Sequence, residues 1–323
     1  MFLESSCRRL LPVGALLSTL GCAELTAVPC LTARNCPTDE VCHIYRNECI
    51  VPDLIVDIGP REQGPNDLAV ALEGASTEEI TLIRVWPRAS WSGDAASYQS
   101  TARVGGGREI YVVGQTVNGV LPQWAPKGLG AEDSVVRVED SSRLRLSSLI
   151  VDGGEAEAAA LSVVGSEVVV ENTALRGTGE TLALSEGSVV HVAASFISGR
   201  RGLHLDRNDE VLLRYSTVVA TEAVSACEGE GLLELRNSLL ASPLGIPSAT
   251  ACDYELPRTY VDLELNPDYF VDPEAGDFHL RPSAAPAVLS DYATLEEEGP
   301  VEDIDGDSIA AISYPGADQP VER

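Results

Sequence analysis

The chain has 323 residues, of which 44% are hydrophobic and only 5% aromatic, and its formal net charge is -28, with Lys127 as the single lysine. This acidity excludes nucleic acid as a partner, because phosphate binding needs a basic surface, and it disfavours anionic lipids and polyanionic substrates. The aliphatic, aromatic-poor composition suits a repetitive solenoid better than an aromatic-rich globular core. An acidic surface that only keeps an exported protein soluble is the alternative to a specific acidic recognition face.

Residues 1–21 are organised like a secretory signal peptide. Arg8 and Arg9 precede an apolar run over 10–20 that is too short to span a bilayer. The end of this run resembles a bacterial lipobox, in which the cysteine after a small residue is acylated, so Cys22 is the expected lipidation site. We expect an outer-membrane or cell-surface lipoprotein that contacts the membrane only through its anchor. A cleaved periplasmic or extracellular protein and a retained leader are the alternatives.

Residues 22–52 are expected to hold a linker and a cysteine-rich module. With Cys7 and Cys22 set aside, six cysteines remain, an even number that permits complete pairing. Zinc sites more often use C-x2-C pairs, so disulfides are favoured over a metal for the four at C-x5-C-x5-C-x6-C spacing: Cys30, Cys36, Cys42 and Cys49. The segment resembles Dickkopf-like modules of bacterial lipoproteins, and the spacing leaves its connectivity open. Cys227 and Cys252 are left to pair with each other.

A helix is expected near the start of the next region, residues 53–290. Asp67 and its neighbour Asn66 can cap a helix over 68–72 that ends at Gly74. Such a helix would cover the unpaired strand edges and the apolar core at the first coil of a solenoid. Strands are expected over 80–86 and 109–113.

Aromatic residues gather in the irregular stretch over 90–130. Loops that protrude from a solenoid often carry ligand sites, so Trp91, Tyr98 and Trp124 are candidate ligand-binding residues. Packing of these rings onto the scaffold is the alternative.

The middle of the chain repeats at intervals of 21 to 25 residues. A small hydroxyl residue recurs, followed two places later by an aliphatic one, at Ser148, Thr173, Ser195, Ser216 and Ser238. Two columns of alternating apolar pairs accompany it: Val136/Val138, Leu161/Val163, Leu182/Leu184, Leu203/Leu205 and Val224/Ala226, and Leu144/Leu146, Val168/Val170, Val190/Val192, Val211/Leu213 and Leu233/Leu235. Alternation predicts strands. Three short strands in each coil predict a parallel β-helix, because each strand pairs with the strand one coil later.

This pattern resembles the right-handed parallel β-helix superfamily, whose pectate-lyase-like members include polysaccharide lyases, glycoside hydrolases, phage tailspikes and bacterial surface proteins. The resemblance implies an all-β, right-handed parallel β-helix solenoid over 53–290. The inward aliphatic side chains are expected to stack into one core, and the hydroxyl residues into a polar ladder. A shared scaffold does not carry a shared activity.

Residues 291–323 are expected to close the solenoid. Together with the Asp277-Phe278-His279-Leu280 strand before it, this segment resembles the closing segment of secreted bacterial β-helix proteins. Asp303, Asp305 and Asp307 alternate like the early ligands of a calcium loop. Tyr314 stands where such a loop has a bidentate glutamate, so a hydrogen-bonded turn is the alternative, and no other cofactor is expected.

Charged residues concentrate on one coil, at Arg200, Arg201, His204, Asp206, Arg207 and Asp209. The β-helix lyases use an arginine or lysine as the base while carboxylate-bound calcium stabilises the developing charge, so these residues are the candidate catalytic group. His204 lies between the inward Leu203 and Leu205 and is expected to point outward. A solvated charged turn is the alternative, since the Asn-Thr-Asp, Asp-Asp and Gly-His-Gly motifs of glycoside hydrolases with this scaffold are absent, as is a nucleophile elbow.

We therefore expect a noncatalytic, exported β-helix protein that presents a binding or structural surface to a glycan or another envelope component. The first rival is a polysaccharide lyase or glycoside hydrolase that uses residues 200–209. The second is a structural spacer without a ligand.

Overall fold

The computed structural model describes most of the chain from residue 41 onward. The described residues are 41–43, 48–50, 52–59, 67–88, 96–155, 157–227, 229–244, 252–262, 269–272, 277–281, 293–294, 303–304, 309, 312–313 and 315–318. The chain divides into two compact units, Met1–Pro52 and Asp53–Arg323. Within the described part, no helix is both long and apolar enough to cross a membrane.

In the first unit, two short strands, β1 (Val41–His43) and β2 (Glu48–Ile50), pair antiparallel. Their register places Cys42 opposite Cys49, and Cys49 is disulfide-bonded. The expected leader, Cys22, Cys30 and Cys36 lie outside the described residues, so lipidation and the connectivity of the module stay predictions.

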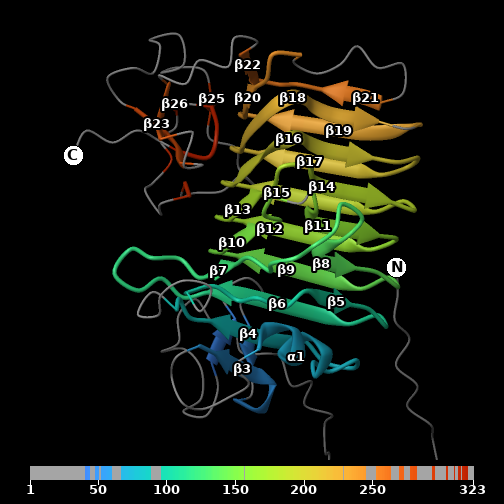
Figure 1. The fold of residues 1–323 in the computed structure, drawn as a ribbon, viewed down its shortest axis with the longest axis vertical. Helices are drawn as coiled ribbons and strands as arrows, with labels where there is room; N and C mark the ends of the chain where they lie inside the picture. Colours follow the sequence, from blue (N-terminus) through green and yellow to red (C-terminus); the bar gives the residue numbers. More distant parts are fainter. Residues whose placement is uncertain are drawn as a thin grey trace, which may run out of the picture. The chain divides into compact units, whose positions relative to one another are not determined.

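The second unit is a parallel β-helix, and its successive coils are stacked strand on strand (Figure 1). After a short 3-10 turn (Pro52–Leu54), the strands fall into three files, which we call faces 1, 2 and 3. Face 1 is a nine-stranded sheet in the spatial order β21 (Cys252–Glu255), β19 (Gly231–Arg236), β17 (Glu210–Arg214), β15 (Val189–Ala193), β12 (Glu167–Glu171), β9 (Arg143–Ser147), β6 (Glu109–Gly114), β4 (Thr81–Val85) and β3 (Ile55–Ile58).

Faces 2 and 3 are joined in one 11-stranded sheet, because β16 (Phe196–Leu205) and β18 (Thr217–Cys227) are long enough to run through both. The first halves of these strands lie in face 2 with β7 (Gln123–Trp124), β10 (Ile150–Asp152), β13 (Ala174–Arg176), β20 (Leu239–Ala241) and β22 (Tyr260–Asp262). Their second halves lie in face 3 with β5 (Ala102–Val104), β8 (Ser134–Val138), β11 (Ala159–Val164) and β14 (Glu180–Ser185). The predicted parallel solenoid with three strands per coil is confirmed.

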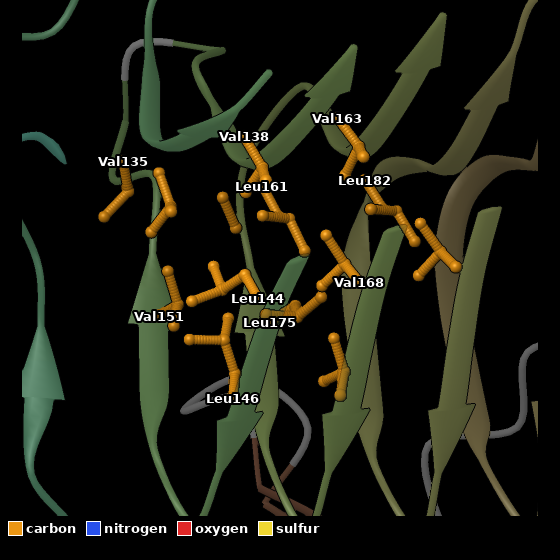
Figure 2. Close-up of a cluster of buried hydrophobic side chains, with 14 of the residues drawn as sticks. Val135, Val138, Leu144, Leu146, Val151, Leu161, Val163, Val168, Leu175 and Leu182 are labelled. Carbon is orange, nitrogen blue, oxygen red and sulfur yellow. The ribbon is translucent and has the colours of Figure 1, made fainter. Parts of the chain in front are cut away.

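Stacked aliphatic side chains fill the space between the faces. The pairs on face 1 align as predicted, for example Leu144 with Val168 and Val211 with Leu233. On face 3, Leu182 lies between Leu161 and Leu203 in register. Figure 2 shows part of this core, in which side chains from all three faces point inward and meet.

Two predicted core pairings are wrong by a single residue, Leu203 with Val224 and Leu205 with Ala226, since Leu205 pairs with Cys227 and Ala226 with the outward His204. Gly199 pairs with Ala220, but after a bulge Arg201 pairs with Ala223, so Leu203 faces Ser225 rather than Val224. The extra residue in β18 shifts the register of the coil. Val224 is still fully buried in the same core cluster.

The predicted polar ladder also begins one coil later than expected. We call the two-residue turn between a face 1 strand and the following face 2 strand a corner. The register places Ser147 beside Glu171 and Ile150 beside Ala174, so Ser148 occupies the first position of its corner rather than the second. From the next coil onward, the hydroxyl of the second corner residue donates to the carbonyl two residues earlier, at Thr173, Ser195, Ser216 and Ser238. The first corner residue has positive φ in all five coils, at Ser148, Asn172, Ala194, Tyr215 and Asn237.

The predicted helix is present as α1 (Leu68–Glu73). The Asp67 carboxylate caps its start by accepting a hydrogen bond from the Ala69 N–H at 2.9 Å, and Gly74 follows its last residue. Leu68 and Leu72 are fully buried in the core cluster of the coils. The helix therefore continues the apolar core beyond its first strands.

Described parts of the carboxyl-terminal region pack against face 2. They include two antiparallel pairs, β23 (Phe270–Asp272) with β24 (Asp277–Leu280) and β25 (Ala293–Thr294) with β26 (Ile312–Ser313). The ring of Phe196 on face 2 meets Phe278 edge to face at 6.2 Å between centroids. We call the described residues from 269 to 318 the C-terminal segment.

The first corner residues of the coils hold this segment through hydrogen bonds. The amide of Asn172 donates to the Asp303 carbonyl at 2.9 Å, and that of Asn237 donates to the Thr294 carbonyl at 3.0 Å. The Tyr215 hydroxyl also donates to the Thr294 carbonyl. The corner between faces 1 and 2 is thus an attachment line for the C-terminal segment.

Candidate functional site

A groove of about 310 Å³ lies on the outer surface of face 3, over β8, β11 and β14, and we call it the face 3 groove. Its floor carries small side chains, because strand alternation turns Ser162 and Ala183 outward between buried aliphatic neighbours. The groove is lined by Ala131, Glu132, Asp133, Ser134, Arg137, Glu157, Ala159, Ser162, Glu180, Ala183 and Arg200. Small residues in the floor leave charged side chains to form its walls.

One outward file of face 3 crosses the groove. Strand pairing aligns Arg137 with Ser162, Ser162 with Ala183, and Ala183 with His204. The groove therefore lies between a cationic residue at one end of the file and the predicted charged cluster at the other.

Two glutamates bracket Arg201 at this second end. Its Nη1 lies 3.0 Å from Glu180 Oε1, and its Nε lies 3.6 Å from Glu222 Oε2. Glu180 and Arg201 are neighbours because β14 and β16 pair in register. The guanidinium charge is thus neutralised where it stands.

Arg200 is held in the same way on the groove side. Its Nη2 lies 3.4 Å from Glu157 Oε2, and its Nη1 lies 3.7 Å from Glu222 Oε1. Arg200 and Arg201 therefore share Glu222 and form one ion-pair network with three glutamates.

His204 points outward as predicted and lies between two carboxylates. Its Nδ1 is 3.3 Å from Glu180 Oε1, with angles outside hydrogen-bond geometry, and its Nε2 is 3.3 Å from Asp206 Oδ1. The contact with Glu180 is the main cause that raises the pKa of His204 to about 9, with Asp206 adding to it against the opposing effect of burial. The same contact lowers the pKa of Glu180. His204 is therefore an imidazolium at neutral pH.

Asp209 belongs to the turn rather than to this cluster. Its carboxylate is buried and accepts hydrogen bonds from the N–H groups of Ser188 at 2.8 Å and Asp206 at 2.7 Å. Burial raises the pKa of Asp209 against these hydrogen bonds. Arg207 is exposed on the same turn. The structure thus brings four of the predicted residues together, Arg200, Arg201, His204 and Asp206, and gives Asp209 a structural place.

Sequence reasoning missed the three glutamates that complete the network. Glu180, Arg201 and Glu222 follow one another at intervals of 21 residues, which is the repeat length, and this spacing was the available signal. Glu157 lies on a turn outside the regular columns, so it carried no comparable signal.

The aromatic candidates do not form a ligand surface in the described residues. Tyr98 is 2% exposed and Trp124 is 1% exposed. The Tyr98 hydroxyl donates to the Trp86 carbonyl at 2.7 Å, and the Trp124 indole N–H donates to the Ser100 carbonyl at 2.6 Å. Both rings therefore pack in the core, which is the alternative to a ligand-binding role, and neither is exposed. Trp91 lies outside the described residues.

The predicted metal and disulfide residues are described only in part. Asp303 is buried, whereas Asp305 and Asp307 lie outside the described residues. No group of three or more potential metal-ligating side chains occurs in the described part of the chain. Cys227 is disulfide-bonded, and the side chain of Cys252 is not described, so their mutual pairing stays a prediction.

A second hollow, of about 230 Å³, lies on the outer surface of face 1. Its two arginines are paired with glutamates, Arg143 with Glu167 at 3.1 Å and Arg145 with Glu171 at 2.5 Å. It is smaller than the face 3 groove.

No protein-family model and no curated protein matches this chain. Among solved structures, it is similar to the deglycosylated pectin methylesterase of Aspergillus niger, with a TM-score of 0.51 and 15% sequence identity over 67% of this chain and 89% of that one. A second structure of that enzyme, penultimately deglycosylated, gives a TM-score of 0.49 and 17% identity over 68% of this chain and 80% of that one. At these identities the first similarity shows the fold alone, a parallel β-helix.

Proposed function

We propose that the coils bind a saccharide in the face 3 groove and do not cleave it. The observation that carries this proposal is the neutralised charge network beside the groove. General base catalysis needs a group whose pKa lies near the working pH. The pKa of His204 is raised to about 9, so this side chain is protonated near neutral pH and is no general base. The pKa of Glu180 is lowered, and its carboxylate is the ionised partner of His204 and Arg201.

The shape and chemistry of the groove support a saccharide as the ligand. Ala159 and Ala183 offer a small apolar floor for a pyranose ring, and the hydroxyls of Ser134 and Ser162 can both donate and accept hydrogen bonds. The charged side chains that form the walls can form hydrogen bonds with the hydroxyl groups of the sugar ring. A neighbour with the same scaffold is a pectin methylesterase, which makes a carbohydrate-active enzyme the main rival.

A screen of the purified full-length chain separates binding from cleavage. We expect oligosaccharides to bind without product formation, with and without calcium. Product formation that is lost in Arg201→Ala but kept in Arg143→Ala, a control on face 1, would contradict the noncatalytic proposal. A spacer without a ligand would bind none of the saccharides.

We also propose that the protein is exported and anchored through Cys22, and that its remaining cysteines are paired. The apolar run before Cys22 and the even number of later cysteines support this. Mass spectrometry of the mature amino terminus tests the anchor: an acylated Cys22 is expected, and an unmodified residue from another cleavage site would contradict it.

A further inference from the structure

The charges that line the face 3 groove are not balanced. Its two cations are both held by glutamates, Arg137 by Glu139 with Nε and Oε2 at 2.9 Å, and Arg200 by Glu157 and Glu222. The carboxylates lining it outnumber these guanidiniums two to one: Glu132, Asp133, Glu157 and Glu180. A ligand in the groove therefore meets an excess of negative charge.

The excess is concentrated on the wall before β8. Glu132 and Asp133 are exposed there, and among the described residues neither carboxylate forms an ion pair. Asp133 Oδ2 accepts one hydrogen bond, from the Gly130 N–H at 2.7 Å, which fixes the turn but leaves the charge uncompensated. This wall faces the small floor formed by Ala159 and Ser162.

We propose that the face 3 groove selects saccharides with a protonated amino group, of the glucosamine class, and rejects uronates. This inference rests on the proposed saccharide-binding function. The ring lies on the small floor and the ammonium lies against Glu132 and Asp133, whose charge no cationic group among the described residues neutralises. The net charge of -28 adds a long-range attraction for cationic ligands.

The opposite charge on a ligand fits poorly. A uronate carboxylate would face the lining carboxylates, while the groove's arginines are already engaged, so like charges would meet without compensation. A bare divalent cation fits less well than an amine, because the described residues hold no cluster of three or more metal-ligating side chains.

Calorimetry on the purified full-length chain tests the selectivity. The probes are hexasaccharides of glucosamine, N-acetylglucosamine, glucose and galacturonate, used at low salt and mildly acidic pH. We expect the glucosamine hexamer to bind about tenfold more tightly than its N-acetylated form, which is the size of effect that two partly exposed ion pairs produce. The galacturonate hexamer should be the weakest ligand.

Two double variants that remove charge test whether Glu132 and Asp133 bind the ammonium group. Glu132→Gln combined with Asp133→Asn should lower affinity for the glucosamine hexamer about tenfold and leave the N-acetylglucosamine hexamer unchanged. Glu78→Gln combined with Glu79→Gln removes the same charge from another exposed adjacent pair and should change neither affinity.

Failure of the amine selectivity can be distinguished from failure of saccharide binding itself. Equal binding of the amino and N-acetylated hexamers, or preference for galacturonate, would overturn this inference and leave the proposed function in place. No binding of any hexamer would overturn the proposed function itself. An oligolysine that binds as tightly as the glucosamine hexamer would overturn the saccharide class.

Discussion

Faces 2 and 3 are built by the same coils, and β16 and β18 run through both, yet the outer surface of face 2 is covered and that of face 3 is exposed. The outward residues of face 2 include apolar side chains, such as Phe196 and Leu239, that are buried under the C-terminal segment. Those of face 3 are small or charged, as at Ser162 and His204, and they border an open groove. In this solenoid the inward residues determine the fold, while the outward residues decide whether a surface is covered or left free to bind.

The largest expected effect tests the core that the two faces share. Leu182→Ala should lower the free energy of unfolding by about 4 kcal/mol, because its side chain is fully buried between Leu161 and Leu203 and would leave a cavity. Urea denaturation measures the change. Ala183→Ser, one residue away on the outside, should shift the unfolding free energy by less than about 0.5 kcal/mol. Similar losses in both variants would contradict the alternation of inward and outward residues.

The next effect separates the covered face from the open one. Phe196→Ala should cost about 3 kcal/mol, because this buried ring packs on Phe278 and on His279, 5.1 Å away between ring centroids. Limited proteolysis should then cut within 269–318 sooner than in the wild type. Val169→Ala on face 1, at a partly exposed position, is the control and should leave the cleavage pattern unchanged. An unaltered pattern in Phe196→Ala would show that the C-terminal segment does not depend on face 2.

The charged border of the groove should show a pH signature. A raised pKa for His204 means that its ion pairs stabilise the fold fully below the ordinary value of 6.5, and that this contribution disappears as pH rises through about 9. His204→Gln should lower the unfolding free energy by up to about 2 kcal/mol near pH 6.5 and leave it unchanged above about pH 9. The loss is limited to this size because the site is partly solvated. His191→Gln, exposed on face 1, is the control. Equal pH dependence of stability in wild type and His204→Gln would be evidence against the Glu180 contact.

The smallest effect concerns the corner that holds the C-terminal segment. Tyr215→Phe removes the hydroxyl that donates to the Thr294 carbonyl and should cost about 1 kcal/mol. Faster hydrogen exchange at the Thr294 amide, which donates to Asn237 Oδ1 at 3.1 Å, would report the loosening. The control is Tyr111→Phe on face 1, which removes a hydroxyl that donates a hydrogen bond to Glu109. It should leave the exchange rate of the Thr294 amide unchanged.

The buried half of the structure could be predicted from the sequence because it is periodic. Apolar pairs such as Val190/Val192 recur at the repeat length, and their strands pair as that spacing requires. The error at Val224 arose where one extra residue in β18 shifts the register. A single added residue does not change the apolar pattern enough to reveal which strand contains it. The error at Ser148 arose because its hydroxyl stands one position before the place that Thr173 occupies in the next coil, although the strands on both sides pair without a shift.

The outer half was less predictable because its residues are not repeated. His204 could be placed outward from its neighbours, but the groove depends on Ser162 and Ala183 being small, and small residues carry no signal of their own. The covering of face 2 depends on contacts between residues far apart in sequence, such as Phe196 with Phe278. Tyr98 and Trp124 misled for the opposite reason, since aromatic residues in irregular stretches suit a core as well as a binding surface.

The most direct test of an open face 3 beside a covered face 2 is the rate at which a thiol reagent labels single cysteines introduced on each. Ala183→Cys lies in the groove, and Ala174→Cys lies at a position only 4% exposed beneath the C-terminal segment. We predict rapid labelling of Ala183→Cys in the native protein, and labelling of Ala174→Cys only after unfolding. Equal rates at the two positions, or faster labelling of Ala174→Cys, would contradict the account.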